Sequence, residues 1–411
     1  MLLVLQSLAG CSGAPGGRPE SAGTSVQRLL DRWAAAVRDR DESAYLAAVD
    51  PAAAGYRTER RRAFASLAAV PLASWEYRLV RTGGFSPAPG DGRRVTAETE
   101  LRYRLDGYDT APVTTSLRLT LVKRADRWYV AGQEAPGGGG PLWEQGAVTA
   151  VRGEHSLVLG VGQDRARLRA LADLADRAVP AVAAAWPGTW AERVVVEMPA
   201  SLDRMAALLG APASHYRGIA AVTTGEAGDG GTSRALTGDG AAPADRIIVN
   251  PEAYGVLGDF GRRIVLTHET AHVATRALTS PATPLWLSEG FADWAAYRDT
   301  GRTARQAAPE LAAAVSAGRL PQALPEDADF GFAGEAGRLA RAYEEGWLAC
   351  RMIAEQWGEE KLVAFYRAVG GHRRREGALE AALREVLGLG QDEFTERWRS
   401  YVAAGLGRST G

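Results

Sequence analysis

Apolar residues recur at helical spacing near the start of the chain, and further on they alternate with polar ones. The first pattern predicts a helix over residues 26–48, whose buried face carries Val26, Leu29, Leu30, Trp33 and Val37. Alternation then predicts four strands, at 74–82, 94–106, 114–123 and 128–133. A helix followed by antiparallel strands predicts that residues 25–135 form a first unit of the α+β class.

From residue 147 onward, strands alternate with helices. Strands are predicted at 156–161, 193–198 and 246–250, and helices at 164–185 and 201–210. Nearly all of the chain after Leu257 shows helical periodicity. The second unit, residues 147–405, is therefore predicted to join a small mixed sheet to a helical half. Residues 136–146, with four consecutive glycines, predict a linker between the units.

Two neighbouring segments leave their roles open. The segment 246–250 (RIIVN) is either an internal strand or a strand along a cleft that pairs with an extended peptide. Residues 223–245 are rich in Gly, Ala and Asp, which predicts a mobile loop near that strand. Such a loop is one way to cover a cleft, but its composition does not establish that role.

Charge and cysteine content narrow the function classes. The chain has 411 residues, with 48 basic and 49 acidic side chains and a net charge of −1. It lacks the basic stripe that nucleic-acid binding needs. Asp41, Glu42 and Asp50 are interpreted as solvated charges at helix ends. Of the two cysteines, Cys350 is expected to be a buried apolar residue, and no disulfide framework is predicted.

The N-terminus carries a candidate membrane anchor. Residues 1–9 form a short apolar run similar to the end of a signal peptide, and 8–11 (LAGC) resemble a bacterial lipobox, whose cysteine becomes lipidated. Residues 12–24 predict a flexible tether. This predicts a monomeric extracytoplasmic protein, either secreted or attached to the membrane only through a lipid on Cys11, since no apolar stretch of about 18 residues is present. The alternative is a mis-assigned start codon of a cytoplasmic protein.

The candidate chemistry is concentrated in the segment 264–273 (IVLTHETAHV). On a helix, His268 and His272 lie one turn apart on one face, so both imidazoles reach one cation at the roughly 2.0 Å that zinc prefers. Glu269 projects beside them, placed to act on a water rather than to bind the metal. The alternative is an amphipathic helix with two hydrogen-bonded histidines.

A catalytic zinc site needs a third protein ligand and leaves a fourth position open. Downstream of His272, the segment 286–293 (WLSEGFAD) offers Glu289. The prolines within 279–284 are expected to end the first helix and turn the chain, so that a second helix presents Glu289 to the metal. Asp293, one turn later, is expected to accept the second ring N–H of a ligating histidine, His268.

These residues resemble the motifs of the gluzincin superfamily of zinc metallopeptidases, and the nearest likeness is to the small peptidase MA-like bacterial proteins. The resemblance implies Zn²⁺ held by His268, His272 and Glu289, with Glu269 as general base and Asp293 behind the ligands. The interval from His272 to Glu289 is slightly shorter than in the best-known members. The first unit, ending in DRWYVAG, resembles the NTF2-like fold, which hosts enzymes and binding modules alike.

A further segment, 342–346 (AYEEG), resembles the Y-E-x-G segment of the aminopeptidase N group. The resemblance implies that Tyr343 hydrogen-bonds the tetrahedral intermediate. The alternative is a half-buried helix tyrosine with its hydroxyl at the surface, and Glu344 and Glu345 are expected to face solvent. The G-A-M-E-N segment that anchors a free amino terminus in aminopeptidases is absent, and Glu226 is too isolated to replace it. Endopeptidase and exopeptidase action both stay open.

The predicted function is hydrolysis of peptide bonds in a peptide or protein substrate by a zinc metallopeptidase. Two other classes stay open. One is a non-catalytic surface lipoprotein with a structural zinc site and a ligand-binding NTF2-like domain. Glu269 argues against it, because a structural zinc site needs no base. The other is a zinc hydrolase of non-peptide amides, which the same metal and base would serve.

Overall fold

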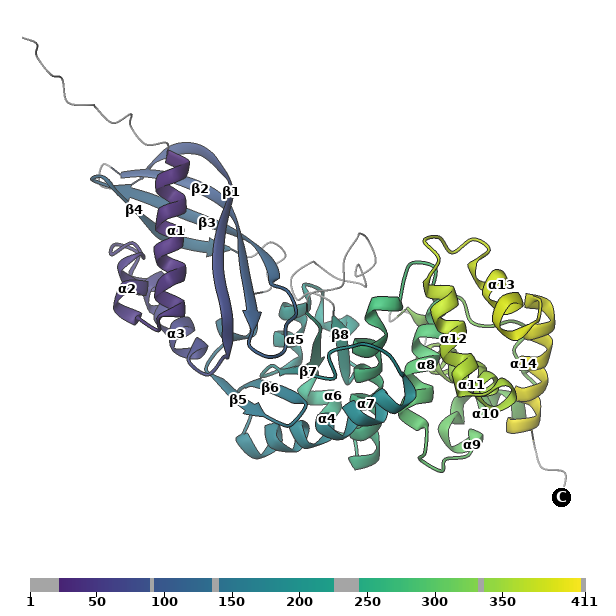
Figure 1. The fold of residues 1–411 in the computed structure, drawn as a ribbon. Coiled ribbons are helices and arrows are strands. Elements are labelled where there is room, and N and C mark those ends of the chain that lie inside the picture. Colours follow the sequence, from purple (N-terminus) through teal and green to yellow (C-terminus); the bar gives the residue numbers. More distant parts are fainter. Residues whose placement is uncertain (1–21, 89–91, 135–139, 225–243, 332–335, 408–411) are drawn as a thin grey trace, which may run out of the picture.

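The protein is an α+β chain whose three parts follow one another along the molecule (Figure 1). The structure is a computed structural model that describes residues 22–88, 92–134, 140–224, 244–331 and 336–407. The parts are an N-terminal unit with an antiparallel sheet, a central unit with a mixed sheet, and a helical C-terminal half. This arrangement confirms the fold class expected from the sequence.

The N-terminal unit contains helices α1 (Ala22–Arg38), α2 (Glu42–Ala47) and α3 (Ala54–Leu67), and strands β1 (Leu72–Ala88), β2 (Gly92–Leu105), β3 (Val113–Arg124) and β4 (Arg127–Glu134). The central unit contains η1 (Leu142–Glu144), β5 (Val148–Arg152), β6 (Ser156–Val161), α4 (Arg165–Ala185), β7 (Val194–Met198), α5 (Leu202–Leu209), η2 (Ala213–His215), β8 (Ala221–Thr224), β9 (Arg246–Val249) and α6 (Pro251–Gly255).

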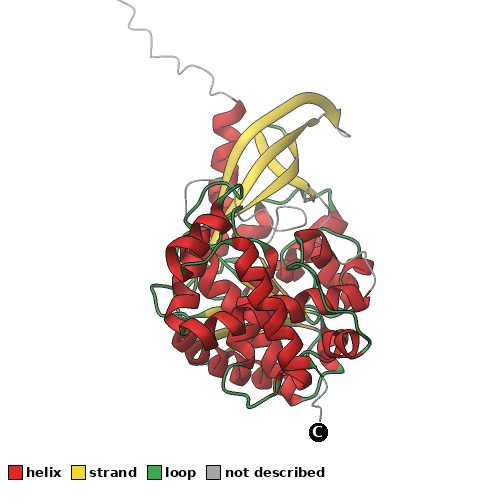
Figure 2. Cartoon of the chain, turned by 90° about the vertical axis from the view of Figure 1, so that its right-hand side faces the viewer, coloured by secondary structure: helices red, strands yellow, loops and turns green. Residues whose placement is uncertain are grey.

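The helical half begins at α7 (Asp259–Thr275) and continues through η3 (Arg276–Leu278), α8 (Leu285–Tyr297), α9 (Ala304–Ala307), α10 (Pro309–Ser316), η4 (Asp327–Phe330), α11 (Ala336–Trp357), α12 (Glu359–Gly370), α13 (Ala378–Ala382), η5 (Leu383–Leu387) and α14 (Gln391–Leu406). Helices dominate the view in Figure 2, while the antiparallel sheet projects beyond them. Cys350 is fully buried in α11, as expected. None of the helices in the described ranges is long and apolar enough to cross a membrane.

In the N-terminal unit, α1 lies against a four-stranded meander with strand order β1-β2-β3-β4. The four predicted strands are confirmed. The apolar face of α1 is buried, and Trp33 stacks on Tyr77 with ring centroids 4.7 Å apart. The single helix expected over 26–48 is wrong, because Arg40 adopts a φ of 58° and Asp41 caps a separate helix, α2.

Asp50 corrects another expectation. Its carboxylate is buried and accepts two hydrogen bonds from Arg124, at 2.8 and 2.9 Å. This pairing, together with the backbone N–H of Ala52, lowers the pKa of Asp50, although burial opposes the shift. Asp50 is therefore part of the packing between the helices and the sheet, and it is not a solvated charge.

The central sheet has strand order β5-β6-β7-β9-β8 and is covered on both faces. Within β6, Leu157 and Leu159 face the N-terminal unit, while Val158 faces α4. Coverage on both sides explains why β6, β7 and β9 are continuously buried. Segment 246–250 thus provides an internal strand, β9, and its neighbour β8 is one of the two edge strands of the sheet, with β5 at the other edge.

Residues 140–146 do not separate the two units as the glycine content suggested. Leu142 and Trp143 are buried, and Trp143 lies edge-on to Tyr103 with centroids 5.0 Å apart. Glu144 forms a two-pronged ion pair with Arg60 of α3. The run of glycines predicted a linker, whereas the three residues Leu142, Trp143 and Glu144 that follow it are packed or ion-paired. Residues 135–139, the rest of the expected linker, lie outside the described residues.

The two units share one hydrophobic core. Side chains from α1, the meander, η1, β6, β7, α5 and β9 belong to a single buried cluster. At its border, Arg246 of β9 donates two hydrogen bonds of 2.8 Å to Asp109, from the β2–β3 connection. Both charged side chains are 1% exposed. Because a buried charge without a partner is costly, this pair fixes the N-terminal unit on the central sheet.

Candidate metal centre

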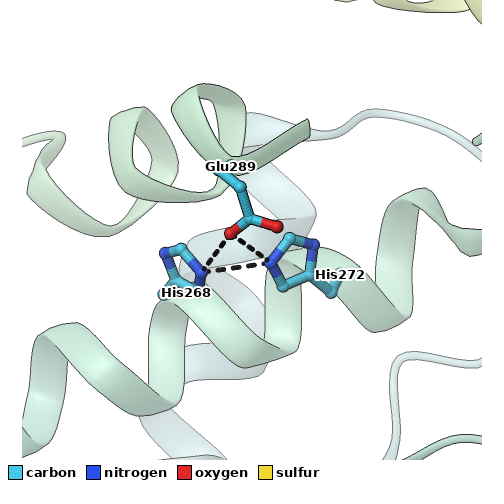
Figure 3. A group of neighbouring side chains, drawn as sticks. All are labelled: His268, His272 and Glu289. Carbon is cyan, nitrogen blue, oxygen red and sulfur yellow. Dashed lines mark hydrogen bonds and ion pairs between the residues drawn. The ribbon is translucent and has the colours of Figure 1, made fainter. Parts of the chain in front are cut away.

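Helix α7 presents both histidines toward α8. His268 and His272 lie four residues apart, so their side chains leave one face of α7 (Figure 3). The connection to α8 is a tight turn in which Ser280 accepts from the N–H of Thr283 at 2.9 Å, and Pro284 is the N-cap residue of α8. Helix α7 already ends at Thr275, before the prolines, and passes into η3; Pro284 then begins α8, which returns across α7 as expected.

The third donor, Glu289, points from α8 into the space between the two imidazoles (Figure 3). Its Oε2 lies 3.2 Å from His268 Nε2 and 3.3 Å from His272 Nε2, and the two nitrogens are 3.1 Å apart. Ligand atoms about 2.0 Å from a tetrahedral ion lie roughly 3.3 Å from one another. Two imidazoles, which bind a metal in their neutral form, and one carboxylate make up this triangle. Their donor atoms and spacing fit a zinc ion.

The electrostatics of the cluster favour a cation. Burial alone would lower the pKa of His268, but Asp293, Glu289 and Glu269 together raise it well above its usual range. Burial alone would raise the pKa of Glu289, yet the two imidazoles lower it below its usual range. Both shifts have one cause: carboxylates lie close to the imidazoles, and such surroundings favour a positive charge at this place, either a proton on an imidazole or a bound cation.

Asp293 lies behind the ligands. Its Oδ1 is 2.8 Å from His268 Nδ1, on the side of the ring opposite the cluster. An imidazole that donates Nδ1–H to a carboxylate keeps its Nε2 lone pair free for a metal and holds its ring in one orientation. The expected partnership between Asp293 and His268 is present.

Glu269, the candidate base, is 7% exposed and does not belong to the donor triangle. Its Oε2 accepts a hydrogen bond of 2.6 Å from the hydroxyl of Thr223, on the edge strand β8. The Thr223 hydroxyl is also 3.1 Å from the backbone carbonyl of Glu269. The carboxylate is therefore held between α7 and β8, beside the ligands.

Two glycines let α8 and α11 approach each other backbone to backbone. A Cβ on Gly290 would lie 2.3 Å from the carbonyl oxygen of Gly346, and a Cβ on Gly346 would lie 2.6 Å from that of Trp286. Neither position accepts a side chain without moving a helix. Gly290 lies in the segment 286–293 with Glu289, and Gly346 lies in the segment 342–346 with Tyr343. The close crossing of the two helices therefore brings Glu289 and Tyr343 to the same site.

Tyr343 faces the cluster. Its ring centroid is 6.2 Å from that of His268 and 5.2 Å from that of Phe330, against which it packs edge-on. Burial, followed by the charges of Glu289, Asp293 and Glu269, raises the pKa of the phenol well above its usual value. The phenol is thus protonated at neutral pH, and its hydroxyl is able to donate a hydrogen bond. A surface-facing Tyr343 hydroxyl, the alternative considered above, does not fit this position.

The two glutamates after Tyr343 do not face solvent as expected. Glu344 accepts hydrogen bonds from the backbone N–H groups of Glu310 and Leu311, at 3.1 and 2.5 Å, in the first turn of α10. Burial raises the pKa values of Glu344 and Glu345 to about 7. Glu344 serves as a cap for a neighbouring helix, a tertiary role with no signature in the local sequence.

Sequence reasoning missed two groups beside the cluster. Thr223 and Thr224 lie in β8, within a segment expected to be a loop, so the contact between Thr223 and Glu269 was not foreseen. Asp245 accepts a 2.7 Å hydrogen bond from Arg276, just after α7, and both side chains are largely buried. Residues 225–243, with Glu226 and most of the expected loop, lie outside the described residues.

Comparison with known proteins adds no relative. The chain matches no family model, no curated protein and no solved structure. The functional conclusion therefore depends on the residues and the geometry described above.

Proposed function

We propose that the protein is a zinc-dependent peptidase, as the resemblance to gluzincins implies. The observation that carries the proposal is the His268–His272–Glu289 triangle together with a buried carboxylate, Glu269, that is not part of it. Three protein donors leave one position of a tetrahedral ion for a water or substrate. The fourth side chain is then available for proton transfer.

The proposed reaction is hydrolysis of an amide bond. When bound, zinc supplies a Lewis acid that polarises the carbonyl and lowers the pKa of a water to about 7. Glu269 accepts a proton from that water as its oxygen bonds to the carbonyl carbon. Glu269 then passes the proton to the amide nitrogen while the C–N bond breaks, which yields a carboxylic acid and an amine. Tyr343 donates to the oxygen that carries the developing negative charge.

The edge strand β8 is the proposed docking strand for substrate backbone. The carbonyl of Ala220 accepts from the N–H of Asn250, so the hydrogen-bonded pairs of this antiparallel ladder recur at Val222 and Thr224. The N–H and C=O groups of Ala221 and Thr223 therefore point away from β9. None of the described strands pairs with this side of β8, and we propose that an extended peptide pairs there, as peptides do at other sheet edges.

A library of peptides incubated with zinc-loaded protein tests the proposal. We expect cleavage that a zinc chelator abolishes and added zinc restores, because the reaction needs the ion. Peptides with blocked amino termini separate endopeptidase from exopeptidase action. Cleavage of non-peptide amides alone would favour the broader zinc hydrolase. If zinc binds and neither class of amide is cleaved, the non-catalytic surface protein becomes the better description.

Tyr343→Phe is expected to lower kcat by about 10²-fold with little change in KM or zinc content, since one donor to a developing oxyanion is worth about that much. Steady-state kinetics and elemental analysis measure the effect. Tyr401→Phe serves as the control, because it removes a hydroxyl that donates to Glu355 on the outside of the helical half. An unchanged kcat for Tyr343→Phe would reduce Tyr343 to a packing residue.

Attachment to a membrane through Cys11, an extracytoplasmic location and a monomeric state belong to the same proposal. Residues 1–21 lie outside the described residues, so the anchor and tether stay predictions. The likeness of the N-terminal unit to the NTF2-like fold stays a resemblance.

A further inference from the structure

We propose that Thr223 is a positioning residue for the general base. The inference rests on the proposed peptidase function and adds to it a link between the strand that would hold substrate and the group that would move the proton. The link is the Thr223 hydroxyl, whose shorter hydrogen bond, 2.6 Å, is to Glu269 Oε2 and whose longer one, 3.1 Å, is to the backbone carbonyl of Glu269. No residue of the recognised motif supplies this contact.

The bond is well placed to be strong. A hydroxyl that donates to a carboxylate forms a charge-assisted hydrogen bond, about twice as strong as a neutral one, and 2.6 Å is within its usual range. Glu269 is 7% exposed, so few waters compete for the same oxygen. The β-branched threonine side chain has little rotamer freedom on a strand, so its hydroxyl is held in position before substrate arrives.

The bond also selects between the two carboxylate oxygens. Donation to Oε2 makes that oxygen the weaker proton acceptor, so a proton taken from water rests on Oε1. The same proton then leaves from Oε1 to the amide nitrogen, and no rotation of the carboxylate is needed between the two steps. A fixed acceptor atom favours proton transfer because catalytic geometry must be held within a fraction of an ångström.

Thr223 has a second contact in the proposal, through its backbone. Its N–H and C=O groups point to the side of β8 away from β9, where an extended substrate would pair. One residue therefore joins the substrate backbone to the base. A peptide that orders β8 would also order Glu269, which converts binding energy into alignment of the reacting groups.

Thr223→Val tests the inference, because it keeps the shape of the side chain and removes the donor. We expect kcat to fall by about 10- to 100-fold, within the range that a 1 Å misplacement costs, with KM, zinc content and melting temperature close to wild type. Thr223→Ser restores the hydroxyl and is expected to recover most of the loss. The control is Thr224→Val, whose Oγ1 is buried without a hydrogen-bond partner in the described residues and whose backbone pairs with β9.

Crystal structures of zinc-loaded wild type and Thr223→Val provide a readout that does not need activity. We expect Glu269 to keep its position in the wild type and to leave it in the valine variant. An unmoved Glu269 together with an unchanged kcat would overturn the inference while leaving the peptidase function intact. If wild-type protein cleaves no peptide, the proposed function fails, and the position of Glu269 in the two structures still decides the role of Thr223.

Discussion

Glu269→Gln is expected to lower kcat for peptide cleavage by about 10³-fold, the middle of the range for loss of a general base. Glutamine has nearly the shape of glutamate and still accepts the hydrogen bond from Thr223, but its amide does not take a proton from water. Since Glu269 lies outside the donor triangle, zinc content and melting temperature are expected to stay at wild-type values. Steady-state kinetics and elemental analysis measure the two effects on the same preparation.

Glu360→Gln is the matched control for this change, because it makes the same substitution at an exposed position of α12. It is expected to leave kcat within twofold of wild type. Cleavage by Glu269→Gln at the wild-type rate would show that another group takes the proton. A loss of zinc in that variant would instead place Glu269 among the ligands, contrary to the geometry of the cluster.

His272→Ala is expected to abolish zinc binding at micromolar metal, and with it the activity. The variant leaves one imidazole and one carboxylate, too few donors for a tetrahedral ion in water. Loss of an outer hydrogen-bond partner such as Asp293 typically weakens metal binding by only about 10–100-fold. Isothermal titration of the metal-free proteins with zinc therefore ranks three variants: wild type binds most tightly, Asp293→Ala less tightly, and His272→Ala least.

The control for the histidine variant is His215→Ala, at an exposed position in η2. It is expected to bind zinc as the wild type does, which separates loss of a ligand from loss of any imidazole. Wild-type affinity in His272→Ala would remove His272 from the ligand set and, with it, the proposed tetrahedral site. The melting temperatures of the metal-free proteins show whether each variant is folded as stably as the wild type.

The candidate metal cluster was predictable because the sequence information for it lies in short segments. Two histidines at a spacing of four must share a helix face, and a proline-containing turn after them must return the chain. The strands of the meander were predictable for a similar reason. When one face of a sheet is buried, apolar and polar residues alternate along each strand. Gly290 and Gly346 lie inside the recognised motifs, but the reason for them, the close crossing of α8 and α11, is visible only in the structure.

What could not be predicted depends on contacts between distant segments. Strand β8 has only four residues beside a glycine-rich stretch, so its pairing with β9 leaves almost no local pattern. From the sequence alone Asp50 was interpreted as a surface charge, because its partner Arg124 lies in a distant segment of the chain. Helix α3 was missed because its sequence carries three consecutive arginines at 60–62, of which Arg60 is buried, and its apolar positions are few. The contact between Thr223 and Glu269 follows only once β8 is known.

The core shared by the N-terminal and central units bears on how the chain folds as it is synthesised. Apolar side chains of α1 and the meander belong to the same buried cluster as Val195 and Ile248, which emerge from the ribosome long after β4. At roughly 5–20 residues per second, that interval lasts on the order of ten seconds. Until it ends, the nascent N-terminal half exposes aromatic surface and leaves Asp109 without its arginine. The interval is therefore the period in which the growing chain most needs protection from aggregation.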